Sequence, residues 1–215
     1  MKIGIIGLGF VGLSLTAVLA SKGFKTVGMD IDKTKCNKIS QGNSPFFEPD
    51  LEKILRKGLK KDLKITNDFL SIRDCDYIFV TVGTPQDTNG AIELSMVKKA
   101  VTKIGEILNQ SKKKPTIFIK STVVPGTMQN IIVDILEKKS QKKAGKDFGL
   151  ISNPEFLQES RAIKDTIYPH VIVLGGYQTK FMSKAQNFFS KLHPKTPIII
   201  TNHQTAEMIK YANNS

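Results

Sequence analysis

The chain has 215 residues, of which 32 are lysine or arginine and 19 are aspartate or glutamate, so its formal net charge is +13. This length can bury a sizeable core, and we expect one or two soluble domains. No run of about 18 apolar residues occurs, which excludes a membrane-spanning helix, and the N-terminus lacks the basic and apolar segments of a signal peptide.

The positive charge comes almost entirely from lysine, because arginine occurs only at Arg56, Arg73 and Arg161. Nucleic-acid interfaces usually combine arginine with aromatic side chains. We therefore favour a solvated lysine surface over nucleic-acid binding. Such a surface would help to attract an anionic ligand.

The cysteines and histidines exclude two further classes of site. Cys36 and Cys75 fit a reducing cytoplasm better than a disulfide framework. His170, His193 and His203 are far apart in the sequence and have no other ligand types beside them. We expect no metal site.

The chain begins with an apolar run, Lys2–Ile6, that predicts a buried strand. The loop Gly7-Leu-Gly-Phe-Val-Gly12 follows, and residues 13–22 then show a helical pattern. A GxGxxG motif between a strand and a helix is typical of dinucleotide binding. Gly7 allows the tight turn, Gly9 allows a pyrophosphate to approach the backbone, and Gly12 allows the helix to pack close to the strand.

Asp30 completes this pattern. It ends a second predicted strand, residues 25–29, and lies eighteen residues after Gly12. A carboxylate at this position would accept hydrogen bonds from both adenosine ribose hydroxyls and would repel a 2′-phosphate. We therefore predict that the chain binds NAD rather than NADP.

The rest of the chain alternates predicted helices and strands without a long linker. In order, we expect a helix at 50–59, strands at 62–66 and 77–82, a helix at 95–108 with Ser95 as its cap, a strand at 115–119, a helix at 127–138, strands at 148–151 and 170–174, a helix at 180–192, a strand at 197–201 and a helix from 206 onward. This order predicts an α/β fold, a Rossmann-type, doubly wound and mainly parallel sheet with helices on both faces. Asp87–Gly90 is expected to form a surface turn.

Three polar segments each follow a predicted strand: Val82–Pro85, Ser121–Thr127 and Asn153–Ser160. The carboxyl ends of parallel strands meet at one edge of a sheet, and ligands bind at that edge. Each segment taken alone also resembles an ordinary turn. Together with the glycine loop, they predict a functional site.

The segment Asn153–Ser160 predicts the start of a helix, with Pro154 in its first turn. Glu155 and Glu159 would then share one helix face. Like charges at this spacing slightly destabilise a helix, so the pair indicates chemistry. The alternative is that Glu155 only complements the helix dipole and that Glu159 is solvated.

These motifs, followed by Ala206–Asn214, resemble the UDP-glucose/GDP-mannose dehydrogenase family over the whole chain. Members of that family oxidise the C6 hydroxyl of a nucleotide sugar to a carboxylate, using two NAD molecules and a covalent thioester on a cysteine. The resemblance favours UDP-glucose as the substrate, with GDP-mannose or UDP-N-acetylmannosamine as alternatives. A stand-alone, non-catalytic NAD-binding module is an alternative of a different class.

For the cofactor, the resemblance implies contacts from the glycine loop, the ribose acid and the polar segments. These residues are Gly7, Gly9, Phe10, Val11, Gly12, Asp30, Lys35, Val82, Thr84, Pro85, Ser121, Thr122 and Glu159. Lys35 would lie on the adenosine ribose side of the cofactor, and Ser121 and Thr122 near its nicotinamide.

For catalysis, the resemblance implies Thr122, Glu155, Glu159, Lys210 and Asn214. Thr122 would help to hold a water molecule, and Glu155 would serve acid–base work and thioester hydrolysis. Lys210 and Asn214 are four residues apart, so on one helix both would reach one oxygen and stabilise its negative charge. The alternative for Lys210 is one more exposed lysine in a lysine-rich chain.

The substrate would be lined by Glu155, Phe156, Leu157, Lys210 and Asn214. Family members carry Asp-Arg shortly before the seventh strand, where this chain has Pro169 and His170. This departure keeps GDP-mannose open as the substrate.

The resemblance also implies a domain organisation. Residues 1–203 correspond to the NAD-binding domain, and residues 204–215 to the start of a central helix that connects and dimerises family members. A second domain would supply the nucleotide-sugar site and the nucleophilic cysteine, which neither Cys36 nor Cys75 matches. We therefore expect a fragment that is inactive alone, from a cytoplasmic enzyme that is a homodimer at full length.

Overall fold

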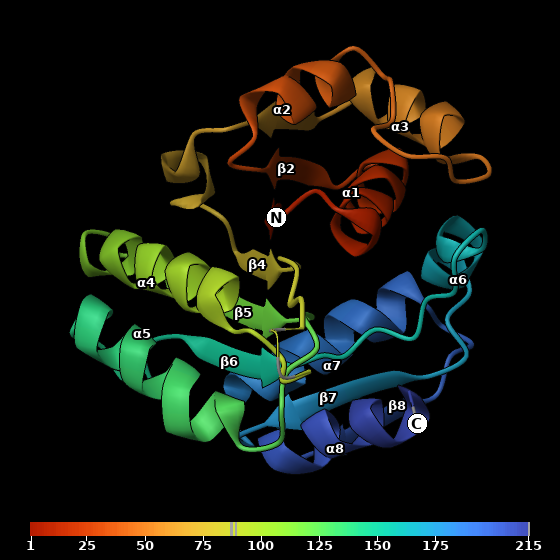
Figure 1. Ribbon diagram of the computed structural model, residues 1–215. Coiled ribbons are helices and arrows are strands. Elements are labelled where there is room, and N and C mark those ends of the chain that lie inside the picture. Colours follow the sequence, from red (N-terminus) through yellow and green to blue (C-terminus); the bar gives the residue numbers. More distant parts are fainter. Residues whose placement is uncertain (87, 89, 215) are drawn as a thin grey trace.

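The computed structural model describes residues 1–86, 88 and 90–214, so part of the turn expected at Asp87–Gly90 and the side chain of Asn214 lie outside the described residues. The chain folds around one eight-stranded sheet with helices on both faces (Figure 1). The strands are β1 (Lys2–Ile6), β2 (Lys25–Met29), β3 (Leu63–Thr66), β4 (Tyr77–Val80), β5 (Thr116–Ile119), β6 (Gly149–Ser152), β7 (Ile172–Gly176) and β8 (Ile198–Thr201).

The helices in the described part are α1 (Phe10–Ser21), α2 (Lys33–Ser40), α3 (Leu51–Leu59), α4 (Ser95–Asn109), α5 (Val133–Ser140), α6 (Ala162–Ile167), α7 (Lys180–Leu192) and α8 (His203–Asn214). A 3₁₀ turn, η1 (Phe69–Ile72), precedes β4, and a π-helical turn, η2 (Met128–Ile132), leads into α5. The predicted doubly wound α/β fold is confirmed.

The order of the strands fixes where a ligand can bind. The sheet order is β3-β2-β1-β4-β5-β6-β7-β8, so the chain builds the sheet on one side of β1 and then on the other. Strands β1 to β6 are parallel to one another. In such sheets ligands bind at the carboxyl ends of the strands, beside the point where the winding reverses. Here that point lies between β1 and β4.

Strands β7 and β8 run in the opposite direction. β7 pairs antiparallel with β6, and β8 pairs parallel with β7. Helix α8 follows β8, so it starts beside the amino ends of β1–β6. From there it runs back toward the carboxyl ends of those strands. Its 12 residues rise by about 18 Å, which carries its last turns to the edge where the polar segments lie.

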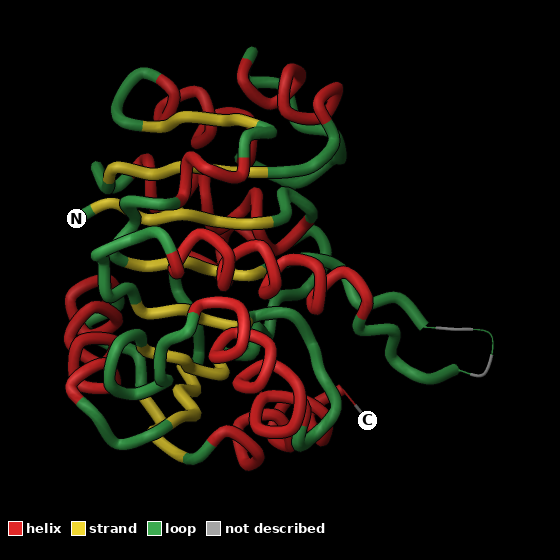
Figure 2. The backbone as a smooth tube through the Cα atoms, turned by 90° about the vertical axis from the view of Figure 1, so that its left-hand side faces the viewer, coloured by secondary structure: helices red, strands yellow, loops and turns green. Residues whose placement is uncertain are grey.

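Two apolar cores hold the sheet from its two faces. On β5, Phe118 belongs to the core that includes α1 and α7, whereas Ile117 and Ile119 belong to the core that includes α4 and α5. This alternation follows from the period of two in a strand, and both sets are apolar because both faces are covered. Away from these cores, Gln86 and Ile92 pair as an antiparallel bridge in a segment that extends from the body (Figure 2).

One prediction of secondary structure is wrong at the most informative segment. Residues 153–158 have no regular structure, and α6 begins only at Ala162. The side chain of Asn153 donates to Val173 O (2.9 Å), and that of Glu155 accepts from Leu157 N (2.7 Å). These contacts hold the segment as a loop, so Glu155 and Glu159 do not share a helix face.

The start of α4 also differs from the prediction. Ser95 is the first helical residue, and Leu94 occupies the N-cap position without a side-chain hydrogen bond. Ser95 is therefore not a cap.

Candidate cofactor and catalytic site

The glycine loop leaves open space over the start of α1. Gly7 has φ +93°, and a Cβ added there would lie 2.9 Å from Val82 N. A Cβ at Gly12 would lie 1.8 Å from Gly7 O, whereas a Cβ at Gly9 would meet nothing within 4 Å. Gly9 is the N-cap of α1 and no side chain caps this helix, so its N-terminus is free to bind an anion such as a pyrophosphate.

The next two residues of the motif, Phe10 and Val11, begin α1 and are half-buried. The ring of Phe10 packs 5.7 Å from that of Phe46, which anchors the start of the helix against the segment before α3.

Asp30 is buried at the carboxyl end of β2 and points toward the glycine loop. Its Oδ2 accepts from Leu8 N (2.7 Å) and Lys35 Nζ (3.0 Å), and its Oδ1 accepts from Asp32 N (3.0 Å). Burial raises the pKa of Asp30, but these hydrogen bonds outweigh it and hold the pKa below its ordinary value. A carboxylate has about four acceptor positions, so one remains for a ribose hydroxyl unless Lys35 moves away.

The loops after β1, β4, β5 and β6 lie side by side, as predicted from the sequence. Ser121 donates from Oγ to Val82 O (2.6 Å), which joins the loops after β5 and β4. Thr84 and Thr122 are half-buried and Pro85 is exposed. These residues lie at the edge that the glycine loop also reaches.

Glu155 and Lys210 form an ion pair at this edge. Lys210 Nζ lies 3.0 Å from Glu155 Oε1, and both side chains are largely buried. The same ammonium lies 5.6 Å from the centre of the Phe156 ring, a cation–π contact, while Leu157 donates its backbone N–H to Glu155. The bland alternative of an exposed Lys210 is wrong, because α8 brings this lysine from the far end of the chain to the predicted site.

Other predicted residues are less closely joined. Glu159 is exposed, and its side chain makes no hydrogen bond or ion pair with another described residue. Asn214 lies in the last turn of α8, and its side chain is outside the described part of the structure. The structure therefore gathers part of the predicted catalytic set around Glu155.

Lys120 belongs to the same cluster, although it was not among the site residues predicted from the sequence. Its Nζ donates to the side-chain oxygen (3.2 Å) and the backbone oxygen (3.4 Å) of Asn153. Burial lowers the pKa of the Lys120 ammonium to about 8, against an opposing effect of the Glu155 charge, and Lys210 lowers it further. Its position directly before Ser121 at a strand end was the available signal.

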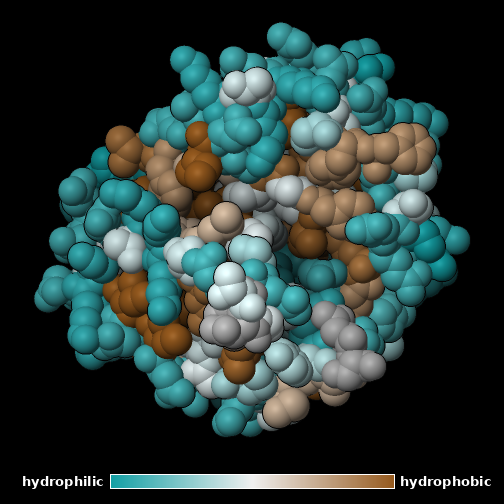
Figure 3. Space-filling view, in the orientation of Figure 1, coloured by the Kyte–Doolittle hydropathy of each residue, from teal (hydrophilic) through white to brown (hydrophobic). Residues whose placement is uncertain are grey.

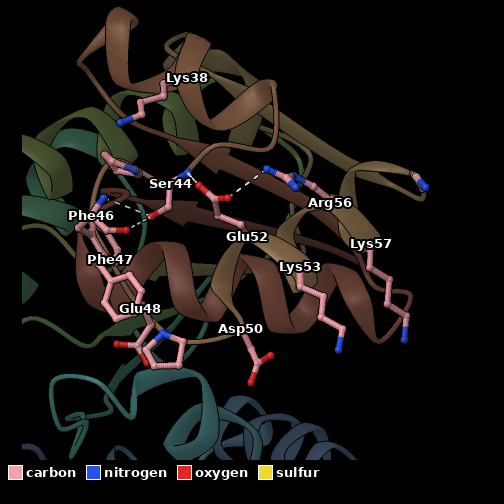
Figure 4. A pocket seen from close by; sticks show the side chains of 13 residues that line it. Lys38, Ser44, Phe46, Phe47, Glu48, Asp50, Glu52, Lys53, Arg56 and Lys57 are labelled. Atoms are coloured by element: carbon pink, nitrogen blue, oxygen red, sulfur yellow. Dashed lines mark hydrogen bonds and ion pairs between the residues drawn. The ribbon is translucent and has the colours of Figure 1, made fainter.

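A hollow of 60 Å³ lies beside this cluster, and its lining includes Val11, Lys120, Asn153, Glu155, Phe156 and Leu157. A larger hollow of 1040 Å³ opens between α2, the segment before α3, and α3 itself, where Glu52 binds both Ser44 and Arg56 (Figure 4). None of the predicted site residues lines the larger hollow, so its size does not make it the functional site.

Seen from the side of Figure 1, hydrophilic side chains dominate the periphery and apolar surface shows toward the middle (Figure 3).

The two cysteines are packed rather than reactive. Burial raises the pKa of the Cys36 thiol, and it raises that of Cys75 to about 11. The thiolate is the nucleophilic form, so neither residue is built for thioester chemistry. Within the described part of the chain, no cluster of three or more acidic, histidine or cysteine side chains could hold a metal ion, and no helix could cross a membrane.

The sequence matches the profile of the UDP-glucose/GDP-mannose dehydrogenase family, NAD binding domain, over residues 1–193. It is 42% identical to a GDP-mannose 6-dehydrogenase of Pseudomonas syringae and 34% identical to a UDP-glucose 6-dehydrogenase of Haloferax volcanii, over its whole length. These matches cover 49% and 51% of the two relatives, so the chain spans about half their length.

Solved structures agree with this result. A ternary complex of GDP-mannose dehydrogenase from Pseudomonas aeruginosa superposes with a TM-score of 0.95 at 38% identity, covering 100% of this chain and 49% of that one. A UDP-glucose dehydrogenase from Pyrobaculum islandicum superposes with a TM-score of 0.90 at 27% identity, covering 99% of this chain and 49% of that one.

Proposed function

The chain belongs to the UDP-glucose/GDP-mannose dehydrogenase family, and from this premise we propose that it is the NAD-binding part of a nucleotide-sugar 6-dehydrogenase. NAD is the cofactor of this domain family, as predicted from the glycine loop and Asp30. The matched part makes up about half the length of the curated relatives. The proposal therefore concerns the activity of the whole protein.

The ion pair of Lys210 with Glu155 carries the proposal. Bringing them together requires the reversed strands β7 and β8 and the part of α8 that leads from His203 to Lys210. A buried cation beside a carboxylate at the edge of a dinucleotide fold is suited to oxidising an alcohol.

Each residue then has a distinct task. Bound NAD supplies the hydride acceptor. The Lys210 ammonium would stabilise negative charge that develops on the substrate oxygen. The Glu155 carboxylate would accept a proton from the substrate or from an attacking water. Thr122, Glu159 and Asn214 keep the roles expected from the family, as proposals.

The nucleotide sugar is the finer part of the proposal. The expectation from sequence motifs was UDP-glucose, with GDP-mannose as an alternative. Similarity over the chain supports the alternative, because curated GDP-mannose 6-dehydrogenases are 38–43% identical and the UDP-glucose relative is 34% identical. We therefore place GDP-mannose first and UDP-glucose second. We also keep the proposal that residues 204–215 begin a connecting helix and that the whole enzyme is a homodimer.

The activity test is NADH formation by the intact protein, with GDP-mannose and UDP-glucose at equal concentrations. Lys210→Ala should lower kcat by about a hundredfold or more, the usual scale for loss of an oxyanion donor, without weakening NAD binding. Lys103→Ala is the matched control, because Lys103 lies exposed on α4 in a pair with Glu106 and lines neither hollow. Unchanged kcat in Lys210→Ala would contradict the proposal.

The same samples distinguish the proposed enzyme from a non-catalytic NAD-binding module. It predicts calorimetric binding of NAD without NADH formation from either sugar. Both readings predict that NAD binds more tightly than NADP, because a 2′-phosphate would face the Asp30 carboxylate. Equal binding of the two cofactors would remove Asp30 from the site.

A further inference from the structure

Glu207 is a buried carboxylate in α8 to which the proposed function assigns no task. Its side chain is 2% exposed. Oε2 accepts from Gly126 N at 2.6 Å, and Oε1 accepts from Met128 N at 2.8 Å. No lysine, arginine or histidine of the described chain forms an ion pair with it.

These two N–H groups lie at the start of the helical segment formed by η2 and α5. Thr127 occupies the N-cap position of this segment, but it makes no side-chain cap hydrogen bond. Its hydroxyl instead donates to Val124 O at 2.6 Å. The first N–H groups of a helix need acceptors, and a carboxylate also suits the positive end of the helix dipole. Glu207 therefore caps this segment from a helix 79 to 81 residues away in sequence.

The cap joins two parts of the candidate site. The loop that ends at Gly126 begins with Ser121 and Thr122, after β5. Glu207 lies three residues before Lys210, one turn earlier on α8. Lys210 itself joins α8 to the loop after β6 through Glu155, while at the start of α8 Asn202 caps Thr205 N and Ala206 packs on Gly175. Within the described residues, the two hydrogen bonds to Glu207 connect α8 to this loop and to the start of the helical segment that follows it.

We propose that Glu207 is a positioning residue that fixes Lys210 relative to the Ser121–Gly126 loop. The inference rests on the proposed function, in which this loop lies beside the nicotinamide and Lys210 beside the substrate. Burying a carboxylate without a cation is costly, and an apolar side chain would fill the same space without that cost. A carboxylate is nevertheless found here, where the N–H groups of Gly126 and Met128 both need an acceptor and Glu207 can serve both.

The test uses Glu207→Gln, Glu207→Asp and a control, Thr179→Ala. Glutamine keeps the volume but accepts through one oxygen, and its NH₂ would face the other N–H. Aspartate keeps the charge and loses reach. Thr179 caps α7 through Phe181 N, so its loss removes a cap of comparable kind that touches neither the loop nor α8.

Two readouts report position rather than stability. The first is the affinity ratio of NAD to ADP-ribose, which is NAD without its nicotinamide ring. The second is the side-chain NMR signal of Lys210, identified by its loss in Lys210→Arg. In Glu207→Gln, NAD should weaken about tenfold, equal to about 1.4 kcal/mol, while ADP-ribose binding stays within about twofold. The Lys210 signal should shift in both Glu207 variants, less in Glu207→Asp.

A folded Glu207→Gln protein with an unchanged Lys210 signal would overturn the proposal, as would an equal change in Thr179→Ala. If Glu207→Gln does not fold, Glu207→Asp decides by the same criteria. Failure of the proposed function appears separately, because the full-length protein with Glu207 in place would then bind NAD without forming NADH from either sugar.

Discussion

Lys120 shows how the site alters a single residue. An isolated lysine keeps its charge up to about pH 10, but burial lowers the pKa of Lys120 to about 8. Its neighbours Glu155 and Lys210 act on its charge in opposite directions. Perturbed groups of this kind gather at functional sites. Lys120 is thus placed to change its charge near pH 8.

We expect one lysine side chain to titrate near pH 8 in an NMR titration of the lysine signals. That signal should be absent in Lys120→Met and present in Lys103→Met, since Lys103 is exposed. Titration of every lysine near pH 10 would contradict the assignment.

The same shift predicts a pH dependence of stability. Because the folded-state pKa of Lys120 lies below its unfolded value, the unfolded chain binds more protons between about pH 8 and 10.5. The wild type should therefore gain stability relative to Lys120→Met as pH rises through this window, as measured by urea unfolding at both ends.

For Asp30, the sequence predicted the position of the carboxylate but not its hydrogen bonds. Its position after β2 and its charge were predictable from the motif. The three hydrogen bonds that already occupy it were not, because they come from Leu8, Asp32 and Lys35 in a geometry that only the folded loop defines. One acceptor position remains where two were expected.

Among the elements, the glycine loop contains one glycine that the fold requires, Gly12, and one that we expect to matter for binding, Gly9. A Cβ at Gly12 would overlap backbone, at 1.8 Å from Gly7 O, and would lie 2.5 Å from Thr81 Oγ1. A Cβ at Gly9 would meet no protein atom within 4 Å, and its φ of −77° suits any residue.

Gly12→Ala should therefore destabilise the fold by about 3 kcal/mol or more, measured by urea unfolding. Gly9→Ala should leave unfolding unchanged but weaken NAD, because the new methyl group lies where the pyrophosphate would approach. Normal NAD affinity in Gly9→Ala would show that the cofactor does not cross this loop.

The loop Asn153–Ser160 was misread for a physical reason. Pro154 and the two glutamates are typical of a helix start, and local sequence carries no sign of the contacts that prevent it. The side chain of Asn153 binds β7 and Lys120, and Glu155 binds Lys210. Three partners from distant parts of the chain thus outweigh a local helix signal.

At the scale of the whole molecule, the alternation of strands and helices was enough to predict the sheet and its binding edge. The reversal of β7 and β8 was not predictable, because their sequences are as apolar as those of the parallel strands. This reversal returns α8 to the site and makes Lys210 a buried partner of Glu155. Long-range pairing, rather than local pattern, therefore completes the candidate site.

Charge is also a property of the whole molecule. Ion pairs leave the net charge of +13 unchanged, because each joins one positive and one negative group, and pairs such as Lys103–Glu106 and Lys138–Asp134 are exposed. Exposed pairs contribute about 1 kcal/mol or less each. Repulsion among the excess lysines should therefore dominate the response of the fold to salt.

We expect the melting temperature to rise by a few degrees when NaCl is increased from about 0.02 M to about 0.3 M, because the screening length falls to about 6 Å. The matched variant replaces three exposed lysines beside the larger hollow with glutamine: Lys53 and Lys57 on α3, and Lys60 at its C-cap. It lowers the net charge from +13 to +10, and its melting temperature should depend less on salt. A melting temperature that falls with salt in the unmodified chain would show that ion pairs, rather than repulsion, govern its stability.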